Sequence, residues 1–372
     1  GVELIREYSQ SDLNHVNLLS MASHLHGYAA ATANVLYRQT RDLKWALACY
    51  RSNRISARLL REHNKRYASY TYGYAGSTAK IMYDETGDTM WLERWHHTKL
   101  ASAILAEETD VTHSAYCYSI AGKSAMKLYD ITKDLNWGYV SYNNYLRSAE
   151  ISIDDNKKHA AHAYSFAGNA AMSLFEQSGE TVWGVLWYES YILSGEFSEG
   201  IEPVHSYNSY RIAGNAARDL YTATDDIDWA KKWHQSLFQS AELCLDVNQR
   251  HAINAYSISG DIAEKVFSAE GETDWAEKMY TSHLKAANLC KQSNPKHSAH
   301  QYSYAGNASK LMAMKTGEES WINDTIFCYE QFLDYYTDNY NSKVHNVIKR
   351  IRSDVYLLKM IIEEEPEPAS KP

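Results

Sequence analysis

Histidines recur along this chain at a fixed spacing of 46 residues, and imidazole is both a common metal ligand and a proton carrier near neutral pH. Five imidazoles in a row could suggest a metal site. If the repeats stack like packed helices, however, residues one repeat apart lie about 10 Å from each other, whereas zinc takes its ligands at about 2.1 Å. We therefore expect no metal, and predict a ladder of hydrogen bonds between adjacent repeats. The histidines are His113, His159, His205, His251 and His297.

Acidic residues interrupt the pattern at one place, residues 195–203, which read GEFSEGIEP. Glu196, Glu199 and Glu202 could supply the paired carboxylates that cleave glycosidic bonds, although a charged linker is more often simply solvated. The chain has no HExxH, CxxC or P-loop sequence. We predict no catalytic, metal-binding or cofactor-binding residue, and keep an enzyme acting on a glycan or lipid as an alternative.

Tryptophan and glycine follow the same period of 46 residues, from Trp45 to Trp321 and from Gly76 to Gly306, with Ala30 in the first glycine position. Self-similarity at this period indicates a repeat architecture whose units bury their apolar faces against each other. We predict that the tryptophans pack in the core, and that Trp95, Trp187 and Trp233, one turn further on, mark a contact surface if exposed. The predicted repeats are 21–66, 67–112, 113–158, 159–204, 205–250, 251–296 and 297–342.

Each repeat reads as two helices. In the third repeat, Tyr118, Gly122 and Tyr129 share one face of a 3.6-residue period. Glycine inside a helix costs about 1 kcal/mol relative to alanine, so its return predicts that another helix approaches closely there. An acid such as Asp134 follows the break in every repeat, where it would cap the second helix. The fold class is therefore all-α, a solenoid of seven helical hairpins.

The two ends depart from the repeat. Residues 1–20 do not fit it and are expected to form an irregular lead-in; because the chain starts with Gly1, we also expect that it was processed or trimmed. Residues 343–362 have the apolar spacing of one amphipathic helix, a predicted C-terminal cap. Residues 363–372, acidic and proline-containing, are predicted to be disordered.

The repeat resembles the tetratricopeptide (TPR) unit. Ala121-Gly122 is similar to the small pair of the TPR first helix, Thr86-Gly87-Asp88 to its turn, and Leu146 with Ala149 to positions of its second helix. Two departures are the 46-residue length, against 34, and the lack of a proline at the repeat junction. The resemblance implies a right-handed superhelix whose concave side is lined by first helices. A closed α/α toroid is the alternative.

Some peptide-binding TPR domains place an asparagine directly after the glycine, where it holds a peptide carboxylate. Three repeats match this pattern, but the companion basic residues of that clamp are not reproduced as a set. We therefore predict a row of polar groove residues that contact a partner rather than a complete clamp. These candidate partner-binding residues are Ser77, Lys123, Asn169, Asn215, Asp261 and Asn307.

Charge and composition narrow the partners. A net charge of −9 disfavours nucleic acid, which needs clustered basic residues, and no apolar run is long enough to span a membrane. The start of the chain does not read as a secretory signal. Cys244 and Cys290 share a repeat position and would be too far apart for a disulfide, so a reducing cytoplasm fits best, with a secreted or cell-surface protein as the alternative.

Together these features predict a non-enzymatic scaffold that binds a protein or peptide on the surface formed by its first helices. A self-assembling structural protein, in which copies of the chain bind one another end to end, is the second hypothesis, because solenoid ends expose faces that can stack.

Overall fold

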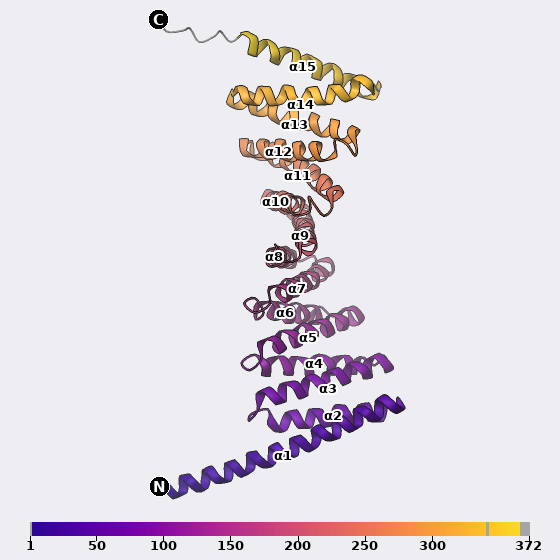
Figure 1. Ribbon diagram of the computed structural model, residues 1–372, viewed down its shortest axis with the longest axis vertical. Helices are drawn as coiled ribbons and strands as arrows, with labels where there is room; N and C mark the ends of the chain where they lie inside the picture. The colour runs from indigo at the N-terminus through magenta and orange to yellow at the C-terminus, as the bar shows by residue number, and fades with distance from the viewer. Residues whose placement is uncertain (1, 340–341, 365–372) are drawn as a thin grey trace. The chain divides into compact units, whose positions relative to one another are not determined.

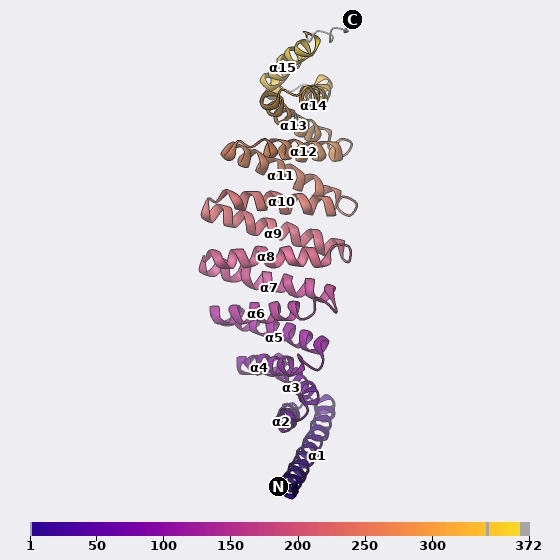
Figure 2. The same cartoon turned by 90° about the vertical axis from the view of Figure 1, so that its left-hand side faces the viewer.

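The computed structural model describes residues 2–339 and 342–364, with side chains described for 15–339 and 342–362. Throughout these ranges the regular structure is helical (Figures 1 and 2). The chain divides into two compact units, residues 1–198 and 199–372. The first unit contains α1 (Val2–Thr40), α2 (Leu43–Leu60), α3 (Lys65–Thr86), α4 (Thr89–Ala106), α5 (Val111–Thr132), α6 (Leu135–Glu150), α7 (Lys157–Ser178) and α8 (Thr181–Ser198).

The second unit contains α9 (Pro203–Thr224), α10 (Ile227–Leu243), α11 (Gln249–Glu270), α12 (Thr273–Cys290), α13 (Pro295–Thr316), α14 (Glu319–Asp338), the short 3-10 helix η1 (Ser342–Val344) and α15 (His345–Glu364). Within each unit, consecutive helices pack against one another. The prediction of an all-α solenoid of stacked helical hairpins is confirmed.

Five of the first helices, α3, α5, α7, α11 and α13, begin at a side chain that caps them, whereas Glu202 before α9 makes no side-chain cap bond. From α3 to α13 these helices start 46 residues apart, at 65, 111, 157, 203, 249 and 295. The side chain of the preceding Asn or Asp accepts a hydrogen bond from the backbone N–H three residues on, as Asn156 does from His159 at 3.0 Å. Each predicted repeat from the second onward begins two residues after the start of its first helix, as at 67 compared with 65 for α3.

The first hairpin lacks this cap, because Leu18 stands at the register position of the capping Asn. With nothing to end the helix there, α1 continues back to Val2. The expectation of an irregular lead-in at 1–20 was wrong in this respect: residues 2–20 are helical.

The turn inside the hairpin uses a left-handed residue followed by an acid. Glycine occupies the left-handed position in four hairpins, for example Gly179 at φ 71°. Asp42, Asp88, Asp134 and Asp226 then cap the second helices through their side chains, whereas Glu272 and Glu318 make no side-chain cap bond. The prediction that these acids cap is thus confirmed for aspartate, and wrong for those two glutamates.

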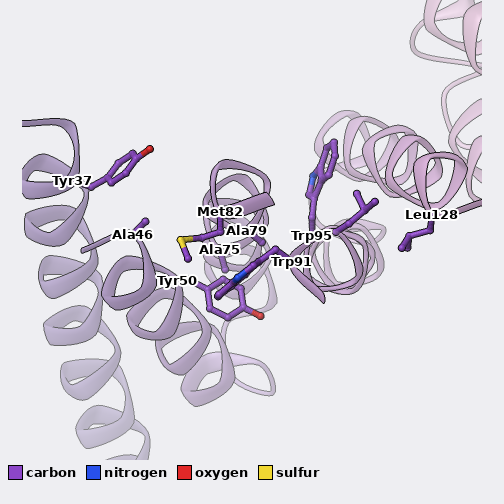
Figure 3. Packing of buried hydrophobic residues seen from close by; sticks show 10 residues of the cluster. Tyr37, Ala46, Tyr50, Ala75, Ala79, Met82, Trp91, Trp95 and Leu128 are labelled. Carbon is purple, nitrogen blue, oxygen red and sulfur yellow. The ribbon is translucent and has the colours of Figure 1, made fainter. Parts of the chain in front are cut away.

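The repeated tryptophan joins consecutive second helices. Within each unit, the ring five residues further along one second helix meets the next repeat's tryptophan in an edge-to-face contact. Tyr50 meets Trp91 at 5.2 Å between ring centroids, and His96 meets Trp137 at 5.3 Å, both nearly perpendicular. Figure 3 shows Tyr50 and Trp91 within a core cluster that also holds Met82 and Trp95.

At the end of the second unit, α15 packs on α14 and buries Ile348, Ile351 and Val355 against Phe332 and Tyr336. The tail predicted at 363–372 lies outside the described residues, except that 363–364 continue α15.

Candidate partner-binding surface

The repeated glycine is a point of close contact between the two helices of a hairpin. In each repeat, the side chain 23 residues later lies directly over it. A Cβ placed on Gly168 would stand 2.6 Å from Cδ2 of Tyr191, and one on Gly122 would stand 2.9 Å from the ring of Tyr145. The first repeat has alanine instead, Ala30, and the smaller Asn53 at the partner position. Helix approach therefore explains the recurring glycine.

The residue after the glycine is tied to the same second-helix side chain. Tyr191 donates to Asn169 Oδ1 at 2.6 Å, and Tyr329 donates to Asn307 Oδ1 at 2.8 Å. Lys99 Nζ donates to Ser77 Oγ at 3.2 Å. These predicted partner-binding residues thus have a structural role within the hairpin, one that sequence reasoning did not anticipate.

Three members of the predicted row differ. Asp261 lies 3.9 Å from Nε2 of the buried His283. Lys123 is exposed and Asn215 half-buried, and neither side chain makes a hydrogen bond within the part of the chain that the structure describes. All six residues occupy one register position of the first helices, so they mark one face of each hairpin. Their contact with a partner stays a prediction.

An apolar row that the sequence reading missed lies on the same face. Two residues before the glycine, every first helix carries Tyr, Phe or Ile: Tyr28, Tyr74, Ile120, Phe166, Ile212, Ile258 and Tyr304. Tyr28 is 72% exposed, Tyr74 64% and Phe166 45%. Because helix residues three apart are neighbours on the surface, this row runs beside the post-glycine row. Aligning the repeats on their glycines would have revealed it.

In the first unit, two members of this row, Tyr28 and Tyr74, border a groove of about 780 Å³ between α1 and α3. Tyr28, Tyr70 and Tyr74 supply aromatic surface, and Ser77 supplies a hydroxyl. Such a mixture of rings and a few polar groups is typical of ligand-binding surfaces.

A buried cation lies under this part of the surface. Lys99 is 6% exposed, and Ser77 is its hydrogen-bond partner among the described residues. Burial lowers the pKa of Lys99. Its methylenes pack on Gly76, which positions the ammonium at the edge of the polar row.

The predicted histidine ladder is present. Ser148 Oγ donates to the Ala115 carbonyl at 2.7 Å within its hairpin, and lies 2.9 Å from Nε2 of His159 in the next one. The same arrangement joins Ser102 to His113 and Ser240 to His251. Burial lowers the pKa of His113, His159 and His251, which favours the neutral form of these rings. They act as structural links between hairpins.

The ladder changes at its last rung. Position 286, where the first five repeats have serine, is Ala286. His297 therefore lies against Ser257 instead, at 3.2 Å.

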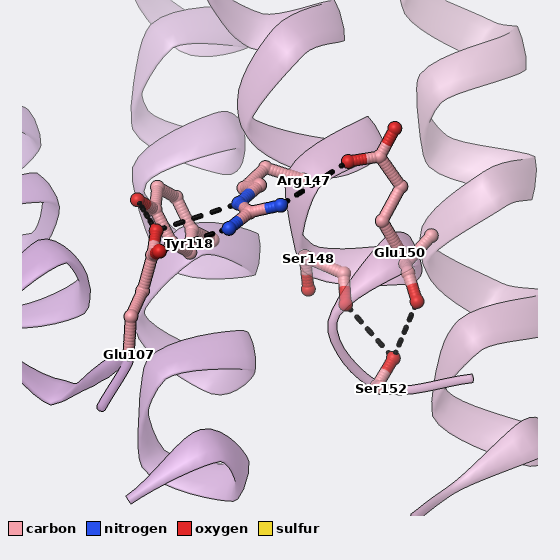
Figure 4. Close-up of polar contacts among 7 residues, drawn as sticks. Glu107, Tyr118, Arg147, Ser148, Glu150 and Ser152 are labelled. Carbon is pink, nitrogen blue, oxygen red and sulfur yellow. Dashed lines mark hydrogen bonds and ion pairs between the residues drawn. The ribbon is translucent and has the colours of Figure 1, made fainter. Parts of the chain in front are cut away.

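The extra tryptophans do not form a contact surface. Trp95 and Trp187 are buried, and Trp233 is half-buried. Neighbouring hairpins are also joined by polar contacts, as Figure 4 shows for the second and third repeats. Arg147 on α6 binds Glu107 at the end of α4 at 2.9 Å, and Tyr118 on α5 donates to the same carboxylate.

The acids of the fourth linker are divided between the two units, with Glu196 in the first and Glu199 and Glu202 in the second. Tyr210 donates to Glu199 at 3.5 Å, and Glu202 stands at the N-cap of α9, while Glu196 lies in α8. Across the described residues there is no group of three or more His, Cys, Asp or Glu that could hold a metal ion. No described helix is long and apolar enough to cross a membrane.

No family model and no curated protein sequence matches this chain. Among solved structures, a circular tandem repeat protein with novel repeat topology and enhanced subunit contact surfaces is 14% identical, covering 95% of this chain and 92% of its own, with a TM-score of 0.42. The apo form of RapI is 11% identical over 78% of this chain and 99% of its own, with a TM-score of 0.35.

A protective antigen of uropathogenic Escherichia coli with an SLR fold is 10% identical over 92% of this chain and 99% of its own, with a TM-score of 0.15. These comparisons concern fold alone. The helices of the chain itself show an all-α protein built of helical hairpins that recur every 46 residues.

Proposed function

We propose that this protein is a non-enzymatic scaffold that binds an extended polypeptide segment on the first-helix face of its first unit. The observation that carries this proposal is the apolar row of Tyr28, Tyr74, Ile120 and Phe166, of which the three aromatic members are exposed. Exposed apolar side chains that line up mark protein interaction sites, whereas scattered ones need no explanation.

Register distinguishes this row from other exposed apolar residues. On the second helices, Tyr139 and Val182 are also exposed, but polar residues interrupt their registers: Glu93 at that of Tyr139, and Lys44 and Asn136 at that of Val182. Exposure that recurs at one register in hairpin after hairpin builds a continuous strip, which is what an extended segment needs. Tyrosine is also enriched among residues that dominate binding energy at interfaces.

Charge supports a polypeptide partner over nucleic acid, because the chain carries a net charge of −9. The five cysteines are free and buried, which fits the reducing cytoplasm, the compartment we propose.

The proposal can be tested with a random 12-residue peptide library displayed on phage and selected on the full chain. Selected peptides would then be titrated by fluorescence anisotropy against Tyr74→Ser and Phe166→Ser, with Val182→Ser and Tyr139→Ser as matched surface controls. We expect each first-helix variant to weaken binding at least tenfold and the controls to leave it unchanged. The proposal would be contradicted if the first-helix variants and the control variants lost the same amount of peptide affinity, or if no peptide were selected. Lys123→Ala and Asn215→Ala test the predicted polar row in the same assay.

A second candidate, self-association, is favoured by α1. Leu18, Met21 and Leu25 are exposed at the three- and four-residue spacing of a coiled-coil seam. The register equivalents of Leu25 in α3 and α5, Thr71 and Cys117, are buried. Light scattering across a hundredfold concentration range would detect self-association as a rise in mass. The Leu25→Glu variant should suppress that rise. A wild-type mass that stays monomeric throughout would exclude this candidate.

A further inference from the structure

On α1, Met21 and Leu25 occupy register positions that a preceding helix covers in later hairpins. Two repeats further on, the same positions hold His113 and Cys117. Both of these side chains contact Ser102 on the preceding second helix, α4, at 3.1 and 3.3 Å. In the part of the chain that the structure describes, no second helix precedes α1. Met21 and Leu25 are therefore 64% exposed each, on the side of α1 where a helix would pack.

Trp45 on α2 lies open in the same way. In the next hairpin, Trp91 meets the ring of Tyr50 from the preceding second helix, 5.2 Å away and nearly perpendicular. Since no described second helix precedes α1, Trp45 has no ring in that place, and it is only half-buried. Met21, Leu25 and Trp45, which we call the open face, thus mark where a further helix with a ring side chain would pack.

The first repeat is also the most basic part of the chain. Residues 21–66 contain nine Lys and Arg against two acids, in a chain whose net charge is −9. Both acids are bound to other cations, and Arg51, Arg54 and Arg58 on α2 make no ion pair within the described residues. No other repeat has Lys or Arg at any of these three positions. Ile55, 40% exposed, lies between Arg51 and Arg58 on one helix face. We therefore expect a partner that combines apolar with acidic residues.

The chain itself contains a helix of this kind, α15. One face of α15 packs on α14. On the outer face, exposed apolar side chains lie within two turns of each other, namely Tyr356, Leu357, Met360 and Ile361, which are 39–66% exposed. Four glutamates follow in the sequence within residues 363–367. The end of α15 therefore offers a ring, an apolar face and negative charge in succession.

The basic residues of α15 do not oppose this match. Lys349, Arg350 and Arg352 lie in the first half of the helix, before the outer apolar face, whereas the glutamates come after it. Lys359, which lies within the apolar stretch, is bound to Glu330 on α14 at 2.6 Å. The charge that remains at the end of α15 is thus negative, opposite to that of the first hairpin.

We propose that the open face of the first hairpin binds the end of α15 from a second copy of the chain, with Tyr356 against Trp45 and the glutamates of 363–367 near the arginines of α2. Such a contact presupposes the self-association given above as the second candidate, and it names the two surfaces that meet. Because the two surfaces differ, the contact is heterologous, and copies joined by it form an open chain or a ring. Charge also sets the direction, since two first hairpins repel each other.

Charge-swapped variants of the full chain test the contact by sedimentation velocity over a hundredfold concentration range. We expect the wild-type mass to rise with concentration, and added salt to reduce the rise by screening the charges. Arg51→Glu/Arg58→Glu and Glu363→Arg/Glu364→Arg should each raise the dissociation constant at least tenfold. An equimolar mixture of these two variants should associate like the wild type, because each reversed surface meets its complement on the other variant. Variants that had merely lost their fold could not restore association in this way.

Arg250→Glu/Lys296→Glu is the matched control, since it makes the same charge change at exposed residues of the second unit and should leave the wild-type rise unchanged. Tyr356→Ser should weaken association at least tenfold. A wild type that stays monomeric would overturn both this contact and the self-association candidate. A rise in mass that persists in both charge-swapped variants, or that their mixture fails to restore, would overturn this contact alone.

Discussion

Gly168 and Tyr191 lie in direct contact across the hairpin of α7 and α8, and a Cβ on the glycine would stand 2.6 Å from Cδ2 of the ring. The same tyrosine donates to Asn169, the next residue along α7. One aromatic side chain thus explains both the glycine and part of the polar row that follows it.

Gly168→Ala should therefore destabilise the protein, although alanine favours helix by about 1 kcal/mol. The ring and its hydrogen bond must shift, and overpacking costs roughly 1–3 kcal/mol. Gly214→Ala is the matched control, because its nearest neighbour is the flexible end of Leu237 at 3.2 Å, and it should be neutral or stabilising. Melting temperatures compare the two. A Gly168→Ala variant at least as stable as Gly214→Ala would show that the ring moves at no cost.

Ser148→Ala should remove one rung of the serine–histidine ladder. The Ala115 carbonyl and the His159 ring both lose the Ser148 hydroxyl, at a cost of roughly 1–3 kcal/mol. Chemical denaturation measures the loss. The converse change, Ala286→Ser, adds a hydroxyl at the position that lacks one and should draw His297 away from Ser257. A fully unchanged denaturation curve for Ser148→Ala would mean that the rung adds no stability.

Glu272→Asp should stabilise α12. The glutamate at its N-cap makes no side-chain cap bond, whereas Asp226 at the same position of α10 accepts from the Asp228 N–H at 3.0 Å. A shorter carboxylate at 272 gains that bond, worth about 1 kcal/mol. The reverse change, Asp226→Glu, should lose it. Opposite shifts in melting temperature are expected, and shifts of the same sign would refute the capping argument.

Stability should fall as the pH drops from 7.5 to 5.5. Burial lowers the pKa of both His96 and His234 to about 4, from about 6.5 in the unfolded chain. Between these values the unfolded state binds more protons, so acid favours unfolding. The loss is about 1 kcal/mol per histidine by pH 5.5. Urea midpoints of the wild type and a His96→Tyr/His234→Tyr double variant measure it; the variant should show a smaller pH dependence.

The sequence by itself determined the helical hairpins and their period. Helix starts, turns and caps are local events: Asn156 caps its own helix, and Leu18, which cannot cap, lets α1 continue. The recurring tryptophan and glycine likewise had to be packing positions, because one side chain type at one register in successive units implies one repeated contact.

Only the tertiary structure decided which residues on the first helices are available to a partner. Asn169 was predicted as a groove residue, yet it is engaged by Tyr191 from the other helix, while the adjacent Phe166 row is exposed. The sequence also does not show that buried polar atoms such as His234 Nε2 and Ser282 Oγ lack a hydrogen-bond partner among the described residues. Whether such groups are satisfied depends on side chains brought together from different helices, and no local pattern records that meeting.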